Sequence, residues 1–164
     1  LKESFASVVH SKQALGIFDK VINKSDKKLS ELNKNSILEI SNYLSLDKST
    51  IFKSSTEMKP VGKSSQRLLD LCKKSESDIY LTGHGALNYL DHELFEQNSI
   101  EVFYIKYEFV PYKTSVRDYT PYVSCLDAIA HLGAKTNGTM KSKMVHWSDA
   151  ILDPASLRPF SNTS

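Results

Sequence analysis

The residues best suited to chemistry fall in one short stretch of the chain, between positions 82 and 91. Its polar and titratable side chains belong to Thr82, His84, Asn88, Tyr89 and Asp91. Gly83 and Gly85 flank the histidine, and glycine allows positive φ angles or close approach of another group to the backbone. His84 or Asp91 could act as a general base, while amides of the glycine turn or Asn88 could stabilise an oxyanion. The stretch therefore predicts a site that binds a small molecule.

A structural alternative exists for the same residues. Asn88 and Asp91 also suit the capping of backbone amides in a tight turn, with Tyr89 packed against the protein. A metal site is not expected, because the spacing of His84, His92 and Glu93 matches no standard zinc pattern. No cofactor is expected either.

Strands must position this turn. Residues 79–81 form a short apolar run typical of a buried strand, and residues 100–107 are rich in β-prone side chains. Residues 50–54 are a further strand candidate. The turn follows the 79–81 strand directly, and open α/β sheets bind their ligands beyond the carboxyl ends of strands. The order of the elements predicts an α/β fold with a small parallel or mixed sheet and crossover helices.

Helical spacing of apolar residues dominates the first part of the chain and predicts a helical hairpin over residues 2–44. With 164 residues, the chain is long enough for one domain with a real core. We expect a single domain over residues 1–151, with its α/β core at 50–133 and a polar and aromatic extension at 134–151. Residues 152–164 are expected to be a frayed tail.

A helix beginning near residue 64 carries the tripeptide Gly62-Lys63-Ser64 at its start. This tripeptide is not a P-loop, because position 57, where that motif needs its first glycine, is Glu57. An ordinary capped helix start explains it.

A long aromatic segment, residues 109–122, follows the last strand of the expected core. Loops of this length often bind ligands or act as lids. Its Tyr112 could stack on a sugar ring or a base, although core packing is the alternative, and its Arg117 suits a phosphate or carboxylate. Asp127 lies just beyond and is either a further site acid or a first-turn residue favoured by the helix dipole. We expect the 109–122 segment and the 82–91 turn to line one cleft.

Composition narrows the choice of partners. The chain has 21 basic and 19 acidic residues, a near balance that gives no sign of nucleic-acid binding. It contains no run of about 18 apolar residues, so no membrane span is expected. Cys72 and Cys125 lie in apolar helical patterns and fit buried free thiols, which favours a cytoplasmic protein. The oligomeric state is not predicted.

Several of these segments together resemble a known family. They are Arg67-Leu68-Leu69-Asp70-Leu71-Cys72-Lys73, Asp78-Ile79-Tyr80-Leu81-Thr82-Gly83, Asn88-Tyr89-Leu90-Asp91, Ile100-Glu101-Val102, Pro111-Tyr112 and Tyr122-Val123-Ser124-Cys125-Leu126-Asp127. The string resembles the C-terminal portion of the WbqC-like family of surface-polysaccharide and O-antigen cluster proteins. Members carry a Ser-Gly-Pro or similar turn where this chain has Thr82-Gly83-His84, so the resemblance implies no role for His84. Members also have an N-terminal half rich in Gln, Pro, Tyr and Trp, which is expected to be missing here.

The resemblance implies a setting in polysaccharide assembly, and a glycyl or other acyl transfer to a nucleotide-linked sugar. In that hypothesis His84 and Asp91 are catalytic. The substrate-binding residues would be Thr82, Gly83, Gly85, Asn88, Tyr89, Tyr112, Arg117 and Asp127. The partner would be a nucleotide-sugar or sugar-acyl substrate. The alternative is a non-catalytic binding or assembly module that contacts a partner enzyme through the helical hairpin.

Overall fold

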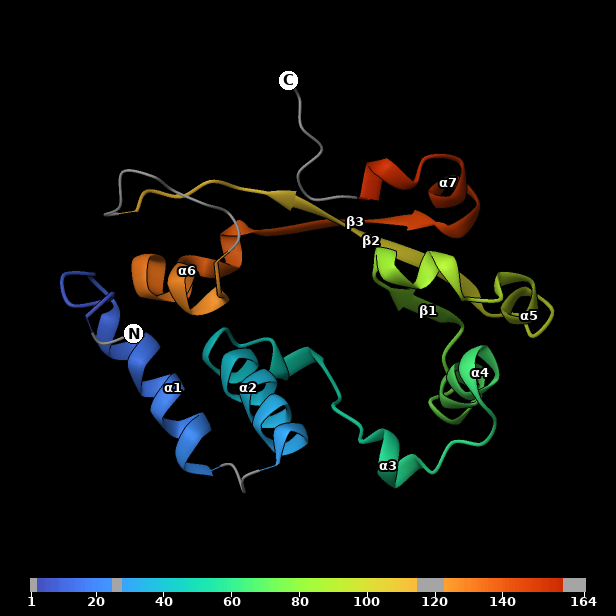
Figure 1. Cartoon of the computed structure of the whole chain (residues 1–164), viewed down its shortest axis with the longest axis horizontal. Helices are drawn as coiled ribbons and strands as arrows, with labels where there is room; N and C mark the ends of the chain where they lie inside the picture. Colours follow the sequence, from blue (N-terminus) through green and yellow to red (C-terminus); the bar gives the residue numbers. More distant parts are fainter. Residues whose placement is uncertain (1–2, 25–27, 115–122, 158–164) are drawn as a thin grey trace. The chain divides into compact units, whose positions relative to one another are not determined.

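Two separately packed units make up the chain in the computed structural model. One unit comprises Leu1–Ile51 and Val110–Met140, and the other comprises Phe52–Phe109 and Lys141–Ser164. The structure describes residues 3–24, 28–114 and 123–157. Each unit is described by itself below (Figure 1).

The first unit is helical. It contains α1 (Ser11–Lys24), α2 (Leu29–Tyr43), η1 (Asp47–Ser49), α6 (Cys125–Leu132) and η3 (Gly133–Thr139). α1 and α2 form the expected helical hairpin, which is confirmed, and α1 also packs against α6. The buried residues of α1, Ala14, Ile17 and Val21, follow helical spacing and form one apolar stripe.

Contacts that are distant in sequence close this unit. The backbone N–H of His10 donates a hydrogen bond to the carbonyl of Ala130 at 2.8 Å. The Asn137 side chain donates one to the carbonyl of Leu44 at 2.6 Å. α6 ends at Gly133, whose φ of 59° is a left-handed conformation that favours glycine. A side chain at this position would also meet the His10 ring at 3.0 Å.

The second unit carries the sheet, in the order β1 (Ile79–Thr82), β2 (Glu101–Phe109) and β3 (Met140–His146). β1 and β2 are parallel, with Thr82 opposite Tyr104. Figure 1 shows β3 running in the opposite direction to β2, so the sheet is mixed. The expected α/β class with a small mixed sheet is confirmed.

Short helices surround this sheet. They are α3 (Ser55–Met58), α4 (Ser64–Lys74), η2 (His84–Asn88), α5 (His92–Glu96), α7 (Trp147–Leu152) and η4 (Pro154–Leu157). The helices η2 and α5 form the crossover between β1 and β2. Residues 50–54 adopt no regular structure, so the strand expected there is wrong. No helix in the described parts of the chain is long and apolar enough to cross a membrane.

One face of the sheet is covered. Its buried β2 residues, Val102 and Tyr104, belong to a core whose other members are Leu69, Cys72, Ala86, Leu90, Phe95, Ile100, Ala150 and Leu157. The opposite face includes Ile79 and Leu81, which are exposed in this unit. Because side chains alternate along a strand, this arrangement turns Tyr80 and Thr82 toward the covered side.

Leu157 tests whether the segment after α7 contributes to the fold. It is 1% exposed, although it lies where the sequence predicts a frayed tail, whereas Leu152 is 83% exposed. Leu157→Ala should lower the free energy of unfolding by about 2–5 kcal/mol, because it removes a buried side chain. Leu152→Ala should change it by less than about 0.5 kcal/mol. Urea unfolding of both variants measures this, and equal stabilities would show that the segment does not pack.

Candidate functional site

The 82–91 turn begins where β1 ends. Thr82, the last residue of β1, is half-buried. His84 and Asn88 are exposed on η2, and Tyr89, which follows it, is 59% exposed. The turn therefore presents its polar side chains outward instead of sealing them in the core.

The two glycines of the turn lie in ordinary backbone conformations. Gly83 has a φ of −93°, and Gly85 is not among the glycines with positive φ. A Cβ atom added at either position would meet no atom of the described chain within 4 Å. The fold therefore does not require glycine at these two positions, and the space in front of both Cα atoms is open to another molecule.

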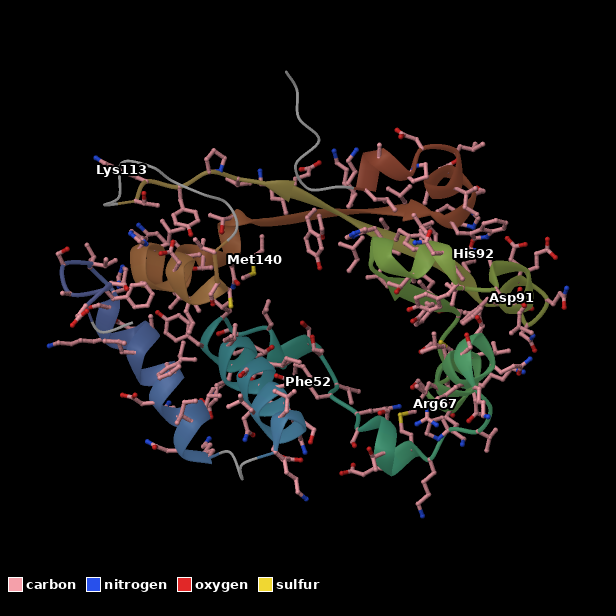
Figure 2. All side chains as sticks on the ribbon, viewed as in Figure 1. Phe52, Arg67, Asp91, His92, Lys113 and Met140 are labelled. Carbon is pink, nitrogen blue, oxygen red and sulfur yellow. The ribbon has the colours of Figure 1, made fainter. Side chains whose placement is uncertain are left out.

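Asp91 has a structural role in this turn (Figure 2). Its Oδ1 accepts a hydrogen bond from the backbone N–H of Leu94 at 3.1 Å, which makes Asp91 the N-cap of α5. Its own N–H donates to the Ser65 hydroxyl at 3.0 Å. The structural alternative for Asp91 is thus realised, since one carboxylate oxygen is engaged in capping.

A buried polar pair lies behind the turn. His92 Nε2 and the Tyr104 hydroxyl are 2.8 Å apart, and the His92 ring stacks on Trp147 with a centroid distance of 4.8 Å. Trp147 donates from Nε1 to Glu96 at 2.7 Å. Burial lowers the pKa of His92 and raises that of Tyr104 to about 12. This pair holds the start of α5 against β2.

His92 is buried in the core of the second unit. No group of three or more potential metal ligands occurs among the described residues. Both cysteines are free thiols, and burial raises the pKa of Cys72, which disfavours the reactive thiolate.

Two further candidate residues meet in the first unit. The Tyr112 hydroxyl donates a hydrogen bond to Asp127 Oδ2 at 2.6 Å. His131 Nδ1 lies 3.5 Å from the same oxygen, one helical turn further along α6. The i,i+4 spacing of His131 from Asp127 was a usable signal in the sequence for this pair.

Arg117 lies outside the described residues. Tyr112 and Asp127 belong to one unit and the 82–91 turn to the other. The expectation that the turn and the 109–122 segment line one cleft therefore stays a prediction.

His92 makes the stability of the chain pH-dependent in a defined direction. Because burial lowers its folded-state pKa below 6.5, the unfolded chain binds a proton before the folded chain does as the pH falls. The contribution of His92 to the free energy of unfolding should be complete above about pH 6.5 and decline below it. Urea unfolding should show that the free energy of unfolding of the wild type exceeds that of His92→Gln at pH 8, and that this difference shrinks as the pH falls to 5. A difference that stays constant with pH would contradict this.

Comparison with known proteins shows the family to which the chain belongs. The sequence profile of the WbqC-like protein family matches residues 1–138. An uncharacterised protein of Mycobacterium tuberculosis, Rv1507c, is 31% identical over 108 residues, which cover 65% of this chain and 46% of that protein. No solved structure matches the chain. Because the profile match includes both the helical hairpin and the 82–91 turn, the chain belongs to the WbqC-like protein family.

Proposed function

We propose that this protein acts in surface-polysaccharide (O-antigen) biosynthesis as an acyl or aminoacyl transferase, of the glycyl type, on a nucleotide-linked sugar. The observation that carries the proposal is the open space at Gly83 and Gly85, in a turn that presents His84, Asn88 and Tyr89 to solvent. Membership of the WbqC-like family supports the biosynthetic setting. The aromatic face of Tyr89 suits the apolar face of a sugar ring.

The contacts in the turn favour different roles for the two proposed catalytic residues. Asp91 is engaged as the N-cap of α5, whereas His84 is exposed on η2. We therefore assign the general base to His84 and the positioning of the turn to Asp91. The base accepts a proton from the acceptor hydroxyl or amine as that group attacks the acyl carbonyl. Backbone amides of the glycine turn and the Asn88 amide would stabilise the oxyanion.

Substrate contact is proposed for the other candidates as well. Thr82, at the end of β1, would contact the ligand from the edge of the turn. Tyr112, Arg117 and Asp127 remain proposed substrate-binding residues, although Asp127 already accepts a hydrogen bond from Tyr112. Neither a metal nor a cofactor forms part of this proposal.

Gly85→Ala is the most selective test of the turn. The added methyl group meets no protein atom, so stability should change by less than about 0.5 kcal/mol. The same methyl group would occupy the space that a bound ligand approaches. UDP-glucose and acetyl-CoA serve as probes in thermal-shift titrations. A probe at 100 times its Kd should stabilise the wild type by about 2.7 kcal/mol, and Gly85→Ala should lose most of this.

Two matched variants complete the test. Gly138→Ala, in the other unit, also meets no atom within 4 Å and should leave the thermal shift unchanged. Asp91→Asn keeps a capping side chain and should retain probe binding. Equal stabilisation of wild type and Gly85→Ala by the same probe would show that the ligand does not enter the turn.

One observation favours the assembly module as a second candidate function. The helical hairpin exposes Ile22 on α1 and Leu29 and Ile37 on α2, and Leu29 is 71% exposed. Exposed apolar side chains can contribute to a protein-binding surface. This function requires no chemistry in the 82–91 turn.

Replacing exposed apolar side chains of the hairpin with lysine tests the second candidate function. The double variant Leu29→Lys, Ile37→Lys should fold normally, because both side chains are exposed. If the hairpin is an assembly surface, sedimentation velocity should show concentration-dependent association of the wild type, and the variant should lose it. A wild type that stays monomeric while binding UDP-glucose would argue against this function.

A further inference from the structure

The strand β1 lies at the edge of the sheet and has one side without a neighbouring strand. In the sheet order β1-β2-β3 it pairs, among the described residues, only with β2 (Figure 1). The N–H of Glu101 donates to the carbonyl of Asp78 at 2.8 Å, and Ile79 lies opposite Glu101 in the parallel register. Alternate residues of a parallel strand bond to the same neighbour, so Asp78 and Tyr80 direct their backbone groups toward β2. The N–H and C=O groups of Ile79 and Leu81 therefore point away from the sheet.

These outward backbone groups have no hydrogen-bond partner in the part of the chain that the structure describes. The side chains of the same residues are also exposed, at 41% for Ile79 and 44% for Leu81. Natural edge strands usually carry a lysine, a proline or a bulge that blocks a further strand. The sequence of β1, Ile-Tyr-Leu-Thr, has neither a lysine nor a proline, and its register with β2 is continuous. Its outer edge is therefore open to pairing with another strand.

The outer edge of β1 is complementary to a second copy of itself. Two such strands related by a two-fold axis through Tyr80 run antiparallel, which sets Ile79 opposite Leu81 of the partner subunit. Residues that face each other in this way exchange two hydrogen bonds, one in each direction. The axis generates the same pair on its other side. Every outward N–H and C=O group of the two strands therefore finds a partner.

The distribution of charge favours the antiparallel direction. Glu76 and Asp78 precede β1, whereas no acidic residue occurs from Ile79 to Leu90. An antiparallel pair therefore sets the acidic end of one strand beside the end of the partner strand that leads to His84. The two Asp78 carboxylates are then separated by about four residues, which is about 13 Å and beyond the Debye length of about 8 Å. In a parallel pair they would lie opposite each other and repel.

The side chains on both faces of β1 suit the same pairing. Ile79 and Leu81 project on the uncovered face, where they would join those of the partner subunit in one apolar strip. On the covered side, Tyr80 would lie at the axis, opposite the partner's Tyr80, and it already stacks on Phe95 at a centroid distance of 5.2 Å. Aromatic pairs on opposing strands are favourable. Pairing thus buries apolar surface that the second unit leaves exposed.

We propose that the outer edge of β1 is a dimerisation surface, at which two copies of this chain pair antiparallel through Ile79 and Leu81 into one continuous sheet. The dimer does not rest on the proposed acyl transfer, because its hydrogen bonds use backbone groups that precede the 82–91 turn. A strand of four residues buries less surface than a standard protein interface, so we expect a dissociation constant between about 1 µM and 1 mM.

The first measurement is sedimentation equilibrium of the full chain at concentrations up to about 1 mM. Ile79→Pro removes an outward N–H and leaves the pairing with β2 intact, since proline is tolerated at the first residue of an edge strand. It should raise the dissociation constant of the dimer at least about tenfold, because each copy loses a hydrogen bond across the interface. Ile51→Pro, at an exposed position without regular structure in the other unit, is the matched control and should associate like the wild type.

The second measurement tests the register by disulfide cross-linking. Ile79→Cys and Leu81→Cys chains, each with Cys125→Ser and a tag of different size, are mixed and oxidised, while the native Cys72 is buried. Opposite residues of a hydrogen-bonded antiparallel pair have Cα atoms about 5.5 Å apart, which a disulfide can bridge. The mixed disulfide should therefore form. Either chain alone should not cross-link, because its two cysteines lie about two residues apart along the strands.

A wild type that stays monomeric at about 1 mM would overturn the proposal, and an edge that pairs only with extended peptides of other proteins gives this result. Equal association of wild type and Ile79→Pro, without the mixed disulfide, would overturn it as well. If Ile79→Pro does not fold, Leu81→Lys and the mixed disulfide decide. The lysine keeps the backbone groups and sets like charges near the axis, so Leu81→Lys should weaken the dimer.

The same experiment separates this dimer from association through the helical hairpin. Hairpin association would be lost in the double variant Leu29→Lys, Ile37→Lys and retained in Ile79→Pro, which would overturn the β1 dimer. The opposite result, with the mixed disulfide formed, supports it.

Discussion

The hydrogen bond between His92 and Tyr104 is the constraint on which the second unit depends. The Tyr104 side chain is fully buried, so its hydroxyl would cost free energy without a partner. Its partner, His92 Nε2, is 2.8 Å away on the first residue of α5, immediately after Asp91. This bond therefore fixes the end of the 82–91 turn against β2. The stack of Trp147 on the same imidazole brings α7 into the arrangement.

Local patterns in the sequence predicted the elements whose burial is regular. The helical hairpin and the strands after residues 78 and 100 follow from apolar spacing and β-prone side chains. Residues 50–54 read as β-prone yet form no strand, because β propensity counts only where a neighbouring strand and a core are present. β3 lies in the expected polar and aromatic extension and was not predicted as a strand, because its residues are mostly exposed.

The sequence predicted where the 82–91 turn lies, whereas the site at this turn stays a prediction. The polar groups around Gly83 and Gly85 lie in an exposed turn, and the capping role of Asp91 was foreseen as an alternative. The pairing of His92 with Tyr104 was not predictable, because it depends on how α5 crosses β2. Sequence spacing did contain the link from Asp127 to His131, whereas the link to Tyr112 depends on tertiary structure.

The fold requires glycine at some positions of the chain and not at others. Gly62 and Gly133 have positive φ angles of 83° and 59°, and added Cβ atoms there would meet neighbours at 3.0 Å, so the folded chain itself accounts for them. Gly83 and Gly85 have neither a positive φ angle nor a close neighbour. Any requirement for glycine at these two positions must therefore come from outside the described chain. A molecule that approaches the backbone of the turn is the simplest source of such a requirement, which is why the turn and not the aromatic segment carries the proposed function.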